Sequence, residues 1–133
     1  MSACGIWLSG RRLIAVLVDD DGRSAPTLCA PMNDDERWSL LEAVDAAHGL
    51  NWSLVLPEDL LRTDAIGRLA LGRGHELWSA PRPLVDAIRS VAGLANGARV
   101  AAMLARLAIV PGFRAQLRRV ERSANDFRQL SLL

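Results

Sequence analysis

Residues 4–22, CGIWLSGRRLIAVLVDDDG, decide the fold class of this chain. The apolar stretch 4–10 predicts a short strand, and the β-branched run at 11–23 predicts a second strand that ends in an acidic turn. Because an Asp-Gly pair favours chain reversal, the chain is expected to turn back there into a third strand at 24–32. Two prolines place this third strand near an edge of the sheet. The three strands together predict an antiparallel meander.

The rest of the chain alternates between helical and strand patterns, which indicates an α/β protein. A helix capped by Asn33 or Asp34 and ended by Gly49 precedes an apolar strand at 51–57, of the kind buried on both faces of a parallel sheet. The remaining predicted elements are a helix over 59–72, a strand over 75–81 and helices from 82 onward, with breaks at 93–97 and 111–112. We therefore predict a mixed five-stranded sheet, three antiparallel strands followed by parallel ones, with helices on both faces.

The composition is that of one domain whose core is large enough to fold without disulfides or metal. The chain has 133 residues, half of them apolar, and no run reaches the ~18 uninterrupted apolar residues of a membrane helix. The order of basic and apolar residues at the N-terminus is wrong for a secretory signal, so a cytoplasmic location without a membrane partner is expected. Cys4 and Cys29 fit that compartment as small buried residues, because they lack the partners of a zinc or CxxC site.

Positive charge is concentrated towards the C-terminal end. Residues 1–98 carry nine Arg and thirteen acids, whereas residues 99–133 carry seven Arg and two acids. The sequence contains no Lys, so all 16 of these basic residues are Arg. The guanidinium of Arg suits bidentate contact with phosphate. We therefore predict a domain at 1–110 and an Arg-rich helical extension at 111–133, whose candidate nucleic-acid contacts are Arg114, Arg118, Arg119 and Arg122. The alternatives are that this helix packs on its own domain or pairs with a second copy.

Several short motifs occur in an order that resembles a known family. They are GIWLSG at 5–10, an acidic turn at 20–22, Glu58 after one strand, Pro81 after the next, and GARVAAMLA at 97–105. The series resembles the RuvC-like N-terminal domain of bacterial DEDD transposases over most of the chain. The resemblance implies a ribonuclease-H-like fold and a role in DNA replication, repair or recombination.

The acids of this family are mostly absent from the matching positions. Trp7, Gly97 and Val100 stand where the family has Asp, and only Glu58 or its neighbour Asp59 matches a family carboxylate. The family's chemistry needs clustered carboxylates, because two divalent cations ~4 Å apart must be held by oxygen ligands. A single Glu cannot hold such a pair, so we expect no metal, no cofactor and no enzymatic activity.

A displaced set of acids is the alternative to a lost site. Asp20, Glu58 and Asp86, with Asp19 as a neighbour, would then form the catalytic cluster and bind Mg²⁺. In that case the chain would be a metal-dependent nuclease of the transposase type. The two histidines lie far from any candidate nucleophile in the sequence, so both are expected to be structural.

The sequence ends in QLSLL, which resembles the peptide that binds the bacterial sliding clamp. That peptide commonly reads Gln-Leu-Ser/Asp-Leu-Phe; here Gln129, Leu130, Ser131 and Leu132 match, and Leu133 replaces the aromatic residue. In such a peptide the Gln supplies specific hydrogen bonds and the spaced leucines fill an apolar groove. The alternative is that these leucines only complete an amphipathic helix.

Together the patterns predict a non-catalytic adaptor in DNA replication, repair or recombination that docks on the sliding clamp through its tail. The alternatives are the metal-dependent nuclease and a structural homodimer whose tail packs on its partner. The four tryptophans fall at apolar positions and are expected in the core, with Trp38 facing the sheet from the first helix. A base-stacking role would need one of them to be exposed.

Overall fold

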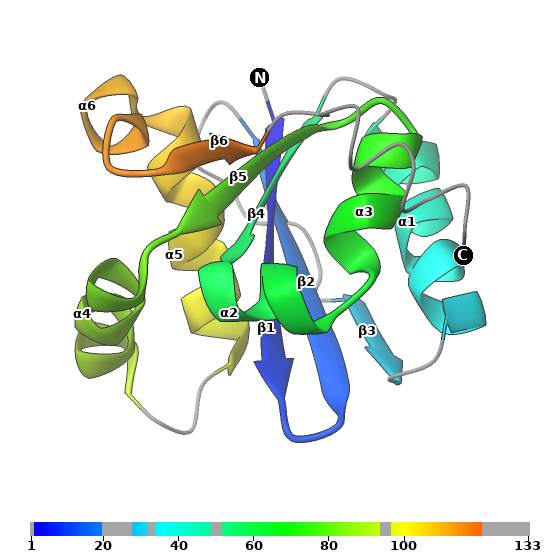
Figure 1. Ribbon diagram of the computed structural model, residues 1–133, viewed down its shortest axis with the longest axis horizontal. Coiled ribbons are helices and arrows are strands. Elements are labelled where there is room, and N and C mark those ends of the chain that lie inside the picture. The colour runs from blue at the N-terminus through cyan, green and yellow to red at the C-terminus, as the bar shows by residue number, and fades with distance from the viewer. Residues whose placement is uncertain (1, 20–27, 32–33, 49–51, 94–96, 121–133) are drawn as a thin grey trace.

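A six-stranded mixed sheet forms the centre of the protein (Figure 1). The structure, a computed structural model, describes residues 2–19, 28–31, 34–48, 52–93 and 97–120. The strands lie in the order β3-β2-β1-β4-β5-β6; β4 is parallel to both β1 and β5, and the other neighbours are antiparallel. Their bounds are β1 Ser2–Ser9, β2 Arg12–Val18, β3 Leu28–Pro31, β4 Trp52–Pro57, β5 Glu76–Ala80 and β6 Arg118–Val120.

The predicted mixed sheet is confirmed, with one strand added. The helical extension predicted over 111–133 is wrong in its described part, because only α6 (Pro111–Arg114) is helical there. Arg118–Val120 instead pair antiparallel with β5. The edge of β5 offers backbone groups that need partners, and this pairing outweighs the helical spacing of the side chains. Residues 121–133 lie outside the described part, and the division of the chain at residue 110 stays a prediction.

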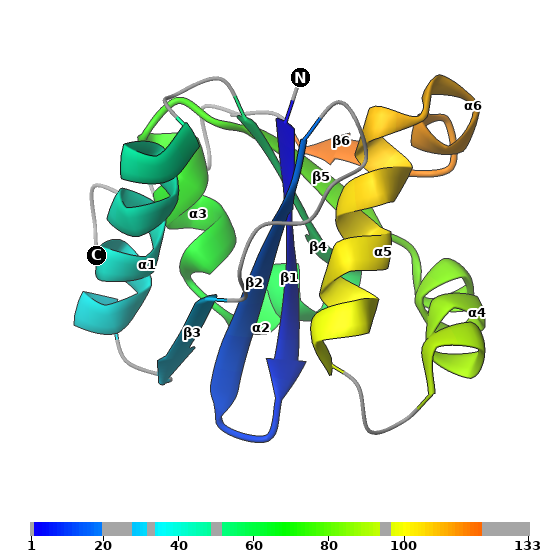
Figure 2. The same ribbon diagram turned by 180° about the vertical axis from the view of Figure 1, so that it is seen from behind.

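Helices cover both faces of the sheet (Figures 1 and 2). On one face lie α1 (Asp34–His48), α2 (Glu58–Thr63) and α3 (Ile66–Gly72), and on the other lie α4 (Arg82–Ala92) and α5 (Gly97–Ile109). Among the described residues, no helix combines the length and the apolar character that crossing a bilayer requires.

The alternation of side chains along β1 separates two apolar cores. Cys4 and Ile6 belong to the cluster under α1–α3, whereas Ala3 and Trp7 belong to the cluster under α4 and α5. Successive side chains of a strand point to opposite faces, so a single strand contributes to both cores. Burial raises the pKa of the Cys4 thiol to about 12, as expected for a structural cysteine.

Helix α5 approaches β1 very closely at Gly5. A Cβ added to Gly5 would lie 1.7 Å from the carbonyl oxygen of Ala101 and 2.9 Å from the backbone nitrogen of Ala105. Ala101 and Ala105 are themselves fully buried. The small residues on both elements therefore let the helix backbone rest directly on the strand.

A buried ion pair joins α1 to the segment between α2 and α3. Nε of Arg37 donates to Oδ1 of Asp64 at 2.6 Å, and Nη2 of Arg37 pairs with Oδ2. Oδ1 also accepts the backbone N–H of Ile66 at 2.9 Å, at the start of α3. The two charged side chains are only 7% and 1% exposed, so this contact belongs to the interior.

A second polar cluster gathers around Asp45 on α1. Nε1 of Trp52 donates to Oδ1 of Asp45 at 2.9 Å, and Nε of Arg73 donates to Oδ2 at 3.0 Å. His75 stacks on Trp52 with ring centroids 3.9 Å apart, and its Nε2 lies 2.9 Å from Oδ1 of Asp45. Burial alone would raise the pKa of Asp45, but the hydrogen bonds from Arg73 and Trp52 and the charges of His75 and Arg73 hold it below its ordinary 3.8. This cluster ties α1 to the amino ends of β4 and β5.

Trp38 departs from its predicted place in the core. Its side chain is 42% exposed, whereas Leu41 and Val44 on the same helix are buried. Nε1 of Trp38 donates to Glu42 at 2.7 Å, and the guanidinium carbon of Arg73 lies 4.6 Å from the ring centroid. The hydrogen bond and the cation–π contact hold the indole at the surface of α1, away from the sheet.

Candidate functional site

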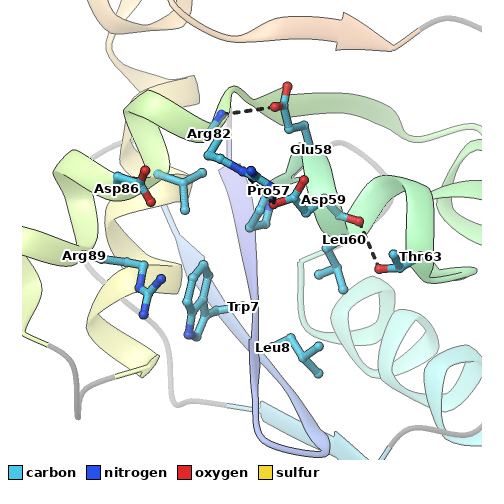
Figure 3. A pocket seen from close by; sticks show the side chains of 11 residues that line it. Trp7, Leu8, Pro57, Glu58, Asp59, Leu60, Thr63, Arg82, Asp86 and Arg89 are labelled. Atoms are coloured by element: carbon cyan, nitrogen blue, oxygen red, sulfur yellow. Dashed lines mark hydrogen bonds and ion pairs between the residues drawn. The ribbon is translucent and has the colours of Figure 1, made fainter.

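The carboxyl ends of β1 and β4 meet at one edge of the sheet. The strand order reverses between them, because β2 and β3 lie to one side of β1 and β4–β6 lie to the other. In open α/β sheets ligands bind outside the carboxyl ends of the strands at such a switch point. A pocket of about 500 Å³ opens there (Figure 3). Its lining residues are Trp7, Leu8, Pro57, Glu58, Asp59, Leu60, Thr63, Arg82, Val85, Asp86 and Arg89.

Trp7 is the largest side chain in this pocket. Its indole is half-buried and packs against the apolar core under α4 and α5. The guanidinium carbon of Arg89, on α4, lies 5.5 Å from the ring centroid, within the range of a cation–π contact. An indole beside a guanidinium can stack a planar ring and hold an anion next to it.

Trp7, Gly97 and Val100, the three positions at which the resemblance leads us to expect Asp, lie on the same face of the sheet. A Cβ added to Gly97 would lie 2.8 Å from Cδ1 of Ile14 and 3.1 Å from Cδ1 of Trp7. Val100, one turn further along α5, is 3% exposed and belongs to the same apolar cluster. The indole of Trp7 therefore borders the space that a side chain at position 97 would need.

Arg82 links α4 to α2 across the pocket. Its Nη2 and Nε donate to Oδ2 of Asp59 at 2.9 and 3.2 Å, and its backbone N–H donates to Oε1 of Glu58 at 3.3 Å. Arg62 also pairs with Asp59, at 3.1 Å. The hydrogen bond from Arg82 is the main cause that holds the pKa of Asp59 below its ordinary 3.8. Asp59 thus pairs with two guanidinium groups, those of Arg62 and Arg82.

The carboxylates at this edge do not form a metal site among the described residues. Glu58 and Asp86 line one pocket, which brings together two of the three alternative acids, whereas Asp20 lies outside the described part of the chain. Within that described part, no group of three or more His, Cys, Asp or Glu is arranged to hold a metal ion. The donors seen here therefore do not fit the pair of Mg²⁺ ions that the family chemistry uses.

A second depression continues from the pocket along α4. It has a volume of about 470 Å³ and is lined by Asp86, Arg89, Ser90 and Gly93. The two depressions share Asp86 and Arg89. We call them together the α4 groove; its first half is lined by both apolar and charged side chains, and its second half by polar side chains and a glycine.

The nucleic-acid contacts predicted from the sequence lie elsewhere. Arg118 and Arg119 are exposed on β6, while Nε of Arg114 donates to the carbonyl oxygen of Ala108 at 2.6 Å. None of these three lines the α4 groove. Arg122 and the clamp-like peptide 129–133 fall outside the described residues.

The patterns in the sequence did not indicate Arg82 and Arg89 as site residues. They stand seven positions apart on α4 with Asp86 between them, a spacing that places all three on one side of a helix. The available signal was their position on a helix that begins directly after the carboxyl end of a strand. Charged residues at that location face the edge where ligands bind.

Comparison with known proteins gives a fold. No protein-family model and no curated protein matches the sequence. A solved structure described as "T. thermophilus RuvC in complex with Holliday junction substrate" superposes with a TM-score of 0.55 at 13% identity, over 90% of this chain and 99% of that chain. The fold is RuvC-like. The predicted α/β, ribonuclease-H-like architecture is thereby confirmed, and the relationship to transposases stays a hypothesis.

The same comparison corrects the expectation that the chain is not an enzyme. The solved structure that shares this fold is RuvC, which is described in complex with a Holliday junction substrate, so the fold itself gives no ground for expecting that activity is lost. The residues at positions 7, 97 and 100 do not by themselves establish a loss of catalysis, because Glu58 and Asp86 remain in the pocket.

Proposed function

We propose that this protein binds nucleic acid during recombination or repair, with an unpaired nucleotide in the α4 groove. The observation that carries this proposal is the pairing of the Trp7 indole with the Arg89 guanidinium at the switch point of the sheet. Stacking of a base on an aromatic side chain contributes ~1–3 kcal/mol and tolerates any base, because every base has a π-face. The RuvC-like fold, seen in a protein solved with a DNA junction, supports the same class of ligand.

The charges of the groove orient the nucleotide. The lining carries the guanidiniums of Arg82 and Arg89 and three carboxylates, those of Glu58, Asp59 and Asp86. Three carboxylates line the first half and one, Asp86, lines the second, so a phosphate is repelled less in the second half, where Arg89 and Ser90 offer donors. The base therefore enters the first half, next to Trp7, and its phosphate lies near Arg89.

Arg89→Gln is expected to weaken binding of a single-stranded oligonucleotide about tenfold, because one charge-assisted hydrogen bond contributes ~1.5–3 kcal/mol. The slope of log K against log salt should also become shallower by roughly one phosphate contact. Fluorescence anisotropy of labelled single strand, duplex and four-way junction, at several salt concentrations, measures both effects.

Arg68→Gln serves as the matched control, because it removes the same charge from α3 on the opposite face of the sheet. Equal affinities for wild type, Arg89→Gln and Arg68→Gln would contradict the proposal. The same complexes, incubated with Mg²⁺ and run on a denaturing gel, report whether the Glu58 and Asp86 carboxylates support strand cleavage.

We also propose that the QLSLL peptide at 129–133 docks on a bacterial sliding clamp; this proposal is supported by its sequence alone. The full chain is expected to bind a purified clamp with micromolar affinity, and a chain that ends at Arg128 is expected not to bind. Surface plasmon resonance with immobilised clamp measures both. Binding that survives the truncation would assign the contact to another surface, and a dimer that dissociates on truncation would favour packing of the tail on a second copy.

A further inference from the structure

We propose that the outer edge of β6 binds an extended acidic segment of another protein, which adds a strand to the sheet. No residue of β6 lines the α4 groove, so this partner is additional to a nucleic acid bound there. Three features favour such a partner: the place of β6 in the sheet, the arginines that it carries, and the hydrogen-bonding groups of a strand edge.

β6 is the last strand on its side of the sheet. The strand order ends at β6, and β5 is the element with which β6 makes extensive contact within the described part of the chain. Figure 1 shows β6 at the margin of the sheet, beyond β5. An edge strand presents backbone N–H and C=O groups without strand partners, and an extended peptide can pair with them.

The opposite edge of the sheet, at β3, is less suited to strand addition. β3 ends at Pro31, which has no N–H to donate, and α1 packs against this strand. Of the two edges among the described strands, β6 therefore offers the better place for a further strand.

β6 carries a positive charge on each of its faces. Arg118 pairs with Ser79 and Arg119 pairs with Trp78, so the two exposed arginine side chains point to opposite faces of the sheet. Within the residues that the structure describes, neither guanidinium takes part in an ion pair. Val120 packs against the core under α1–α3 and holds the strand in place.

These charges disfavour a second copy of the chain as the partner. Pairing of two β6 strands edge to edge would bring the arginines of both copies together, and like charges on neighbouring strands are destabilising. Two consecutive acidic residues in an extended segment point to opposite faces, as Arg118 and Arg119 do. Such a segment places one carboxylate beside each guanidinium.

The backbone of the edge distinguishes a protein segment from a nucleic acid. A strand edge presents both N–H donors and C=O acceptors. A phosphodiester only accepts hydrogen bonds, so it leaves the outward carbonyl groups of β6 without a donor, whereas a peptide strand supplies both kinds of group. The edge of β6 therefore fits an acidic peptide better than a phosphate backbone.

The test uses a fluorescein-labelled peptide, Thr-Val-Glu-Glu-Val-Thr, and the full chain, with binding followed by fluorescence anisotropy. The peptide is expected to bind and to shift the backbone amide NMR signals of Arg118–Val120. Replacing both glutamates by lysine should abolish binding through repulsion. N-methylation of both glutamates should also abolish it, because in either register one blocked nitrogen faces β6.

The Arg118→Gln, Arg119→Gln double variant is expected to bind the acidic peptide about fivefold more weakly, because it loses two exposed ion pairs between strands. The Arg62→Gln, Arg68→Gln double variant is the matched control, since it removes two charges from α2 and α3 and should bind as wild type does. Circular dichroism checks that both variants are folded.

Four results would each overturn the proposal. The first is absence of binding at millimolar peptide. The second is equal binding of the N-methylated peptide, which would show a charge contact without strand addition. The third is an unchanged peptide affinity in the Arg118→Gln, Arg119→Gln variant, including the case in which that variant loses affinity only for duplex DNA. The fourth is a wild-type homodimer, seen in sedimentation, in which the amide protons of β6 become protected from exchange.

Discussion

Gly5→Ala is expected to lower the free energy of unfolding by about 3 kcal/mol, the upper end of the range for an overpacked core. The added Cβ would lie 1.7 Å from the carbonyl oxygen of Ala101, so α5 has to move away from β1. That movement would part Ala101 and Ala105 from the sheet and open gaps in the core under α5. Since small domains are stabilised by only ~5–15 kcal/mol, the loss should be plain in urea denaturation followed by circular dichroism.

Gly112→Ala is the matched control for this substitution. Nothing lies within 4 Å of a Cβ added at position 112, in the short helix α6. Because alanine has a higher helix propensity than glycine, the free energy of unfolding should stay equal or rise slightly. A Gly5→Ala protein as stable as wild type would mean that α5 does not rest on β1 as closely as described.

Asp64→Ala is expected to cost about 3–5 kcal/mol of stability, the range for breaking a buried ion pair by removing one partner. The substitution leaves the buried guanidinium of Arg37 without both carboxylate oxygens that it contacts. It also removes the acceptor of the Ile66 backbone N–H at the start of α3. Urea denaturation compared with wild type measures the loss.

Asp59→Asn tests whether burial is the reason for this effect. Asp59 binds Arg62 and Arg82, but all three side chains are about half exposed or more. Ion pairs at the surface contribute little, so this variant should unfold at nearly the same urea concentration as wild type. Equal losses for Asp64→Ala and Asp59→Asn would show that the buried position of the Arg37 pair has no special effect.

The course of the sheet was largely readable from local patterns. The β-branched run at 11–18 predicts β2, and the continuous apolar stretch at 52–57 predicts β4. Most side chains of both strands are buried, as expected for strands covered by helices on both faces of the sheet. β6 was not predicted because the segment Arg118–Val120 is too short and too polar to have the pattern of a strand. Its strand conformation comes from pairing with β5, which no local pattern in the sequence reveals.

The candidate site was readable only in part. Glu58 and Asp86 were singled out, and both line the groove, because acids near strand ends are visible in a sequence. Arg82 and Arg89 were overlooked in favour of Arg118 and Arg119, since local charge density points to the C-terminal run. Whether an arginine stands over an indole depends on tertiary packing, and spacing along the chain does not contain that information.

The contact between Trp7 and Gly97 couples two positions far apart in the sequence. An aspartate at 97 alone would collide with Ile14 and Trp7, and an aspartate at 7 alone would leave the indole's space empty beside a glycine. Each substitution made alone is therefore expected to lower the stability of the protein, because the residue at the other position is unchanged. A change between an acid pair and the present Trp–Gly pair by two direct single exchanges therefore passes through a less stable intermediate, so positions 7 and 97 are expected to change together.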